Sequence, residues 1–272
     1  MTAFIGSGVS WVELALLLLG LFAVNEIAYR IAARFRHDAP DARKSQADLV
    51  VAALLGLLGL LLAFSFGIGD ERFAKRKELV LDEANAIATT YLRADMLPAP
   101  HGARIQALLR QYIDERTNLK SAADLDRALQ HSAELHGQLW HEATAVAREN
   151  LGSPVVALFV ASLNQVIDLH ESRVTVALFQ RLPPVIFGVL YFVSLLSVAM
   201  VGLRAGLDRT HNRVPAGALV VVIMAVLALI TSLDQPASRL FAISKHALHD
   251  TQQLIEKDRS AVEANGPRAS TK

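Results

Sequence analysis

The chain has 272 residues, 53% of them hydrophobic, and a formal net charge of +1 at pH 7. This apolar fraction and a mean hydropathy of +0.34 exceed those of an ordinary soluble domain and indicate an integral membrane protein. The near-zero net charge gives no general field for binding nucleic acid, which we do not expect as a partner. The lack of cysteine excludes disulfides, thiolate catalysis and zinc–thiolate sites.

Four apolar segments come close to the ~20 residues that a helix needs to cross a bilayer. They cover residues 11–33, 47–69, 182–203 and 214–233. No Lys or Arg precedes the first segment and no small-residue cleavage pattern follows it, so we expect it to be retained as a membrane helix.

The region between the second and third segments has a helical pattern of Leu, Ile, Val and Ala at steps of three and four residues. Proline-containing breaks at 96–102, 150–154 and 181–184 divide it. We expect the second membrane helix to continue to the first break, followed by helices over 103–120 and 124–149 and a fourth that reaches residue 181. The pattern predicts an antiparallel helical bundle.

The predicted fold is therefore all-α, with four membrane helices and a helical bundle inserted between the second and third. The expected divisions are 1–69 for membrane helices one and two, 70–181 for the bundle, 182–233 for membrane helices three and four, 234–264 for a C-terminal segment packed on the bundle, and 265–272 for a disordered tail.

The charges beside the spans do not fix the orientation. Seven cations flank one side (Arg34, Arg36, Arg43, Lys44, Arg204, Arg209 and Arg213) and eight the other (Arg72, Lys75, Arg76, Lys77, Arg173, Arg181, Arg239 and Lys245). The positive-inside rule gives no preference for counts this close.

Asn25 and Glu26 are polar residues within the first membrane segment. A charge in this position is costly and often functional. Arg30 follows Glu26 by four residues and so lies on the same helical face. We favour an internal ion pair over the alternative of a proton or ion relay, because pairing is the usual way that membrane charges are tolerated.

The sequence gives no support for an enzyme. It has no P-loop, GxSxG, HExxH or dinucleotide-binding fingerprint. His131, His136 and His141 are spaced by five residues, which spreads them around a helix and argues against a metal site. We expect neither a metal nor a cofactor.

Four stretches resemble a known family. They are LLAFSFGIGDERF at 61–73, DEANAIATTYLRADMLP at 82–98, FQRLPPVIFGVLYF at 179–192 and SLDQPASRLFAISKHALHD at 232–250. Together they are similar to the bestrophin anion channels, and above all to the bacterial bestrophin-like proteins once known only as a domain of unknown function. The resemblance covers about residues 45–255.

This resemblance implies a bestrophin-like fold in the bacterial inner membrane, with a multi-pass chain and a cytoplasmic bundle. It implies a homo-oligomer, a ring of five subunits, around a pore lined by the second membrane helix and permeable to small inorganic anions of the chloride type. The corresponding neck residues are Gly56, Leu60 and Phe64, which steps of four keep on one helical face. A lipid- or helix-facing Phe64 is the alternative.

The cations after the neck, Arg72, Lys75, Arg76 and Lys77, would concentrate anions at the inner mouth of such a pore. The alternative is a set of interface anchors and i,i+4 pairs on a solvated helix.

The chain also departs from the family pattern. Gly56 replaces a bulky neck residue, which implies a shorter or wider constriction. After the fourth span only Asp234 and Asp250 stand where animal bestrophins have a carboxylate cluster, so we do not expect calcium gating.

Two other functions fit the same layout of spans and bundle. One is a proton- or ion-driven energising or transport subunit, in which Glu26 would be a relay. The other is a membrane signalling protein whose helical bundle senses a ligand.

Overall fold

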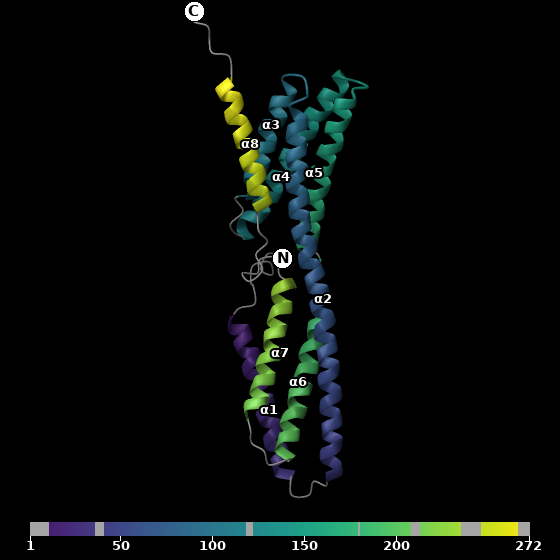
Figure 1. Cartoon of the computed structure of the whole chain (residues 1–272), viewed down its shortest axis with the longest axis vertical. Coiled ribbons are helices and arrows are strands. Elements are labelled where there is room, and N and C mark those ends of the chain that lie inside the picture. The colour runs from purple at the N-terminus through teal and green to yellow at the C-terminus, as the bar shows by residue number, and fades with distance from the viewer. Residues whose placement is uncertain are drawn as a thin grey trace, which may run out of the picture. The chain divides into compact units, whose positions relative to one another are not determined.

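The computed structural model describes residues 11–35, 41–117, 122–178, 180–207, 213–234 and 246–265. These residues form helices and short turns without a strand, which confirms the all-α prediction (Figure 1). The helices are α1 (Trp11–Phe35), α2 (Asp41–Ala94), α3 (His101–Thr117), α4 (Ala122–Glu149), α5 (Pro154–Leu178), α6 (Pro184–Leu207), α7 (Arg213–Asp234) and α8 (His246–Asn265). Of the tail expected at 265–272, Asn265 is the last residue of α8 and residues 266–272 lie outside the described residues, as do residues 235–245.

The chain divides into two compact units. The first comprises Met1–Ala74 and Gln180–Ala242, and the second comprises Lys75–Phe179 and Ile243–Lys272. Helix α2 has 54 residues, or about 80 Å at 1.5 Å per residue, and it contributes to both units. No proline interrupts it, so the chain passes from an apolar segment to a highly charged one within a single helix.

The first unit contains α1, the N-terminal part of α2, α6 and α7 (Figure 1). These four helices are long and apolar enough to cross a membrane, which agrees with the four predicted spans. Leu21, Leu58, Leu190 and Leu227 belong to a shared core. Other large apolar side chains on the same helices are exposed, among them Leu19, Phe192 and Val222. An apolar core with an apolar exterior is what a bilayer requires of its helices.

The second unit contains the C-terminal part of α2 with α3, α4, α5 and α8. Its apolar core includes Ile87, Leu109, Leu139 and Phe159. Helix α2 ends at Ala94 and α3 begins at His101, as the break at 96–102 predicts. Gly102 is needed there for close packing, because a Cβ on it would lie 2.5 Å from the carbonyl oxygen of Ala94.

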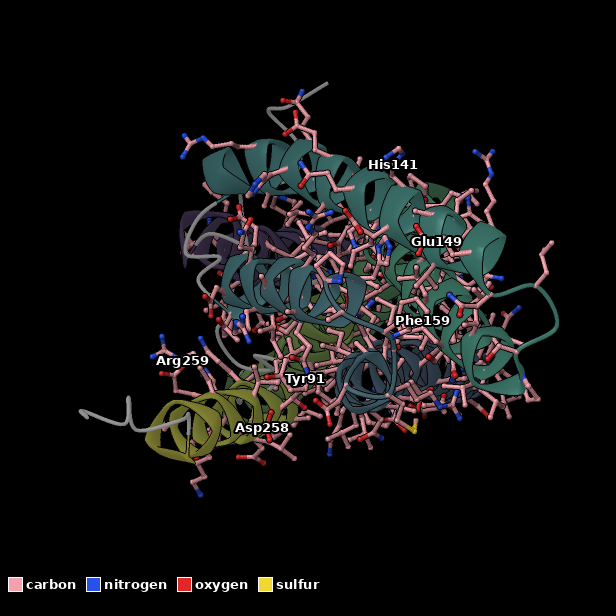
Figure 2. The ribbon with its side chains drawn as sticks, turned by 90° about the horizontal axis from the view of Figure 1, so that it is seen from above. Tyr91, His141, Glu149, Phe159, Asp258 and Arg259 are labelled. Atoms are coloured by element: carbon pink, nitrogen blue, oxygen red, sulfur yellow. The ribbon has the colours of Figure 1, made fainter. Side chains whose placement is uncertain are left out.

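Helix α8 packs onto this second unit. Leu248 and Ile255 are buried in the core, and the Thr251 hydroxyl donates to the carbonyl oxygen of Ala84 at 3.3 Å. The Tyr91 hydroxyl donates to Asp258 at 3.1 Å, and Figure 2 shows these two side chains next to each other. The C-terminal helix is thus bound to α2 by apolar and polar contacts.

Candidate functional site

The predicted neck residues lie on an outward stripe of α2 in the first unit. Leu60 is 54% exposed and Phe64 is 64% exposed, and a Cβ added to Gly56 would have open space. The opposite side of the helix is buried at positions that include Leu58, Leu62 and Ser65. Each step of four residues advances only 40°, so Gly56, Leu60 and Phe64 form one stripe. We call these three residues the α2 stripe.

Phe66 has a different environment from Phe64. It is 38% exposed, and the buried Ser65 separates it from Phe64 in the sequence. Two residues rotate a helix by 200°. The two phenylalanines therefore point to different sides of α2, and Phe64 is the one that continues the α2 stripe.

The four predicted inner-mouth cations do not share one environment. Arg72 belongs to the first unit, whereas Lys75, Arg76 and Lys77 belong to the second. Lys75 and Lys77 are exposed and Arg76 is buried. The Lys75 ammonium donates to Glu78 at 2.9 Å, which is the type of local pair that the alternative interpretation proposed.

Arg72 participates in a joint between α2, α6 and α7 within the first unit. One terminal nitrogen of the Arg72 guanidinium lies 3.8 Å from Oδ1 of Asp234. The same buried carboxylate accepts a hydrogen bond at 2.8 Å from the backbone N–H of Leu182, just before α6 begins. Gly69 lies one turn before Arg72 and packs close to Leu233. The joint therefore fixes the end of α7, the start of α6 and the middle of α2.

Asn25 and Glu26 make separate structural contacts. The Asn25 amide donates to the carbonyl oxygen of Val198 on α6 at 3.1 Å. The Arg30 Nε donates to Glu26 at 2.8 Å, which is the ion pair that their spacing predicts. This bond engages the carboxylate within its own helix.

Helices α1 and α6 approach each other closely at two glycines. A Cβ on Gly202 would lie 2.3 Å from the carbonyl oxygen of Asn25, and a Cβ on Gly206 would lie 2.5 Å from that of Tyr29. Small residues four apart allow membrane helices to pack backbone to backbone. The sequence contains this GxxxG signal, but our sequence reasoning missed it.

The second unit contains a buried charge network around Glu83, a fully buried residue of α2. Arg173 of α5 donates to one carboxylate oxygen. The other oxygen accepts a hydrogen bond at 2.7 Å from the Tyr112 hydroxyl and lies 3.2 Å from Nε of Arg116. One carboxylate thus links α2 to α3 and α5.

Two histidines complete this network. Nδ1 of His170 lies 3.0 Å from the Tyr112 oxygen. Because Tyr112 gives its only hydroxyl hydrogen to Glu83, Nδ1 of His170 must be the donor in this contact. His136 packs edge-on against His170 with ring centroids 4.8 Å apart. The packing extends the network to α4.

Burial and charge shift the protonation of these groups. Burial raises the pKa of Glu83, but the guanidinium groups of Arg173 and Arg116 and the Tyr112 hydrogen bond outweigh it and lower this pKa to about 2. Burial lowers the pKa of both His136 and His170 to about 4. At neutral pH the network therefore contains an ionised Glu83 and two neutral imidazoles.

The sequence analysis missed this network, because it placed Arg173 among the cations that flank the spans and gave Glu83 no role of its own. Glu83 lies in the string DEANAI, where the acidic pair looks like part of a solvated face. Its neighbour Asp82 is only half-buried, whereas Glu83 is completely inside. A weak signal exists, since Glu83 precedes Ala84, Ala86 and Ile87, which are all buried.

Four apolar spans and an inserted helical bundle that shares its first helix with the membrane unit define the class of protein: a multi-helix membrane protein. The model of the Bestrophin-like domain matches residues 18–248. The chain therefore belongs to the Bestrophin-like family. A comparison with curated proteins gives no match.

Solved structures of a bacterial bestrophin homologue from Klebsiella pneumoniae have a similar fold. A variant in which a tyrosine is replaced by alanine has a TM-score of 0.63 at 16% identity and covers 94% of this chain and 100% of its own. A tryptophan-to-alanine variant has a TM-score of 0.63 at 17% identity, with coverage of 96% and 100%. The structure phased with zinc has a TM-score of 0.59 at 16% identity, with coverage of 93% and 98%. At this identity the likeness establishes the fold.

Proposed function

We propose that the protein is an anion channel of the bacterial inner membrane, a ring of five identical chains with α2 lining the pore. The observation that carries this proposal is the α2 stripe, which turns away from the core of its own unit. A single chain encloses no pore with this stripe, so several copies must contribute one α2 each. Membership of the Bestrophin-like family supports this assembly and a chloride-type ion.

In the proposed channel, Phe64 supplies the constriction. A ring of phenylalanine side chains is apolar and bulky, and rings of this kind close pores by excluding water. Leu60 continues the apolar wall, and Gly56 leaves it wide at its other end because it has no side chain. The constriction is therefore short and centred on Phe64.

We assign the attraction of anions to the exposed cations after this neck. Lys75 and Lys77 are exposed and can face an aqueous mouth. Arg72 lies beside Asp234 and is assigned to the joint. The alternative of a proton or ion relay at Glu26 is less well supported, because the Arg30 bond engages that carboxylate. We propose no enzymatic activity.

Purified protein reconstituted in planar bilayers tests this function. Under a potassium chloride gradient, we expect currents that reverse near the equilibrium potential of chloride, without any partner protein. Currents that reverse near the potassium potential, or no current from correctly assembled protein, would contradict the proposal.

Native mass spectrometry of the purified protein tests the assembly. It should give the mass of five chains; a monomer would contradict the proposed ring.

We further propose that the second unit faces the cytoplasm. Gln130 of α4 is exposed, and the chain has no native cysteine. A Gln130→Cys variant in intact cells should resist a membrane-impermeant thiol reagent and react after lysis. Labelling of intact cells would reverse the proposed orientation.

A further inference from the structure

A groove of about 410 Å³ lies in the first unit, where α1 and α6 end and α2 begins. Its walls include Ile31 of α1, Val50 of α2, and Met200 and Leu203 of α6. Arg43 and Gln46 lie on the same groove, in the first two turns of α2. It therefore combines a long apolar surface with polar groups from a single helix end.

The floor of this groove is built from small and apolar residues. Ala32, Ala47 and Leu207 are buried and form a cluster of their own, against which Leu203 packs. Ala32 and Ala47 have single methyl side chains, which keep the floor low and leave space above it. Helix packing closes the groove beneath and leaves it open toward the exterior of the unit.

Arg43 is the charged residue among those that line the groove. Other cations near this end of the helices have partners: Arg204 makes two hydrogen bonds to Asp48, at 2.5 and 3.0 Å, and Arg30 bonds to Glu26. No ion pair joins Arg43 to another residue of the described chain. The Arg43 side chain is exposed, so its guanidinium can reach an anion outside the chain.

The position of the groove restricts the chemistry of that anion. Three helices that are long and apolar enough to span a bilayer begin or end beside it, which puts Arg43 and Gln46 at the level of the lipid headgroups. The walls extend from there toward the hydrocarbon region. A guanidinium binds phosphate strongly, with two parallel N–H bonds, and an apolar wall suits an acyl chain.

We propose that this groove is a binding site for an anionic phospholipid. The phosphate lies on Arg43 with the Gln46 amide as a second donor, and one acyl chain lies along Ile31, Val50, Met200 and Leu203. This proposal is independent of ion conduction, since it concerns the outer surface of the first unit and is measured by bound lipid.

Native mass spectrometry of the detergent-solubilised protein tests the site. Phosphatidylglycerol and phosphatidylcholine with identical acyl chains are added in turn, and the lipid retained per chain is counted. We expect the wild type to retain phosphatidylglycerol preferentially and Arg43→Gln to retain about fivefold less, because one direct hydrogen bond to the phosphate contributes about 1 kcal/mol. The matched control is Arg34→Gln, which removes an exposed cation from the last turn of α1 outside the groove and should behave like the wild type.

A second variant separates the acyl chain from the headgroup. Val50→Trp fills the groove from a side chain that is already exposed, so it should lower the retention of both lipids while the melting temperature is maintained. Equal loss of phosphatidylglycerol in Arg43→Gln and Arg34→Gln would overturn the site in favour of general surface charge. If inorganic phosphate alone displaced the retained phosphatidylglycerol from the wild type, the ligand of the site would be a free anion and not a lipid. A change of oligomer mass in Val50→Trp without loss of lipid would identify a second copy of the chain as the occupant.

Discussion

The two units expose opposite kinds of residue along the same helix. In the first unit α2 buries Leu58 and Leu62 and exposes Leu60 and Phe64, so its two sides are both apolar. In the second unit α2 buries Ile87 together with the ionised Glu83 and exposes mostly polar residues. An apolar exposed side, as in the first unit, suits a helix in a bilayer, and a polar exposed side, as in the second unit, suits a helix in water. The comparison teaches that α2 changes its surrounding medium along its length and keeps its helical structure throughout.

The largest expected effect comes from removing the carboxylate at the centre of the second unit. Glu83→Gln leaves Arg116 and Arg173 without their buried counter-ion, and breaking a buried ion pair in this way costs about 3–5 kcal/mol. The helical signal of the protein in detergent should be lost at a markedly lower denaturant concentration. Glu78→Gln, on an exposed residue of the same helix that accepts a hydrogen bond from Lys75, is the control and should change the midpoint little. Equal midpoints for both variants would contradict the structural role of Glu83.

The next effect concerns the first unit, whose packing depends on small residues. Gly202→Leu places side-chain atoms where the Asn25 carbonyl lies, and overpacking of this kind costs about 1–3 kcal/mol. We expect a lower melting temperature and a weaker contact between α1 and α6. Gly188→Leu, on the same helix with open space around its Cβ position, provides the comparison. A Gly202 variant as stable as the Gly188 variant would contradict the close approach of these helices.

A graded effect is expected from pH, and the groups that cause it lie in the second unit. His136 and His170 have ordinary pKa values of 6.5 that burial lowers to about 4 in the folded protein. The unfolded chain therefore binds more protons between these values, and stability falls as the pH decreases from about 6.5 to 4. Glu83, with its pKa lowered from 4.5 to about 2, loses its stabilising contribution only below pH 4.5.

Melting curves at pH 7.5, 5.5 and 4.5 measure this dependence. The double variant with His136→Gln and His170→Gln should lose most of the slope between pH 7.5 and 4.5, while a further curve at pH 3.5 should still show the loss that belongs to Glu83. A wild-type melting temperature that stays constant between pH 7.5 and 4.5 would show that the imidazoles are not held neutral by burial.

The sequence predicted the helices well because their ends have local causes. Pro98 and Pro100 define the break after α2, and Pro183 and Pro184 separate α5 from α6. These residues act on their immediate neighbours, so composition and spacing are sufficient. The apolar spans are similarly local, since about 20 apolar residues in a row have few alternatives to a bilayer.

The contacts that organise each unit were not predictable in the same way. Arg173 reaches Glu83 from 90 positions away in the chain, and helical periodicity gives no information about such a distance. Arg72 follows a neck-like segment and looked like a pore residue, yet it lies beside Asp234. Gly202 and Gly206 are the intermediate case, because their spacing is a known packing signal but the partner helix becomes evident only from the fold.

The central claim is that the α2 stripe lines a pore, and current recordings of two phenylalanine variants test it most directly. Phe64→Ala removes the apolar bulk from the proposed constriction and should increase conductance or open probability, because water can then bridge the neck. Phe66→Ala removes the same side chain from another side of the same helix and should leave the current near that of the wild type. Equal effects of the two substitutions, or an unchanged current in Phe64→Ala, would contradict the assignment of α2 as the pore wall.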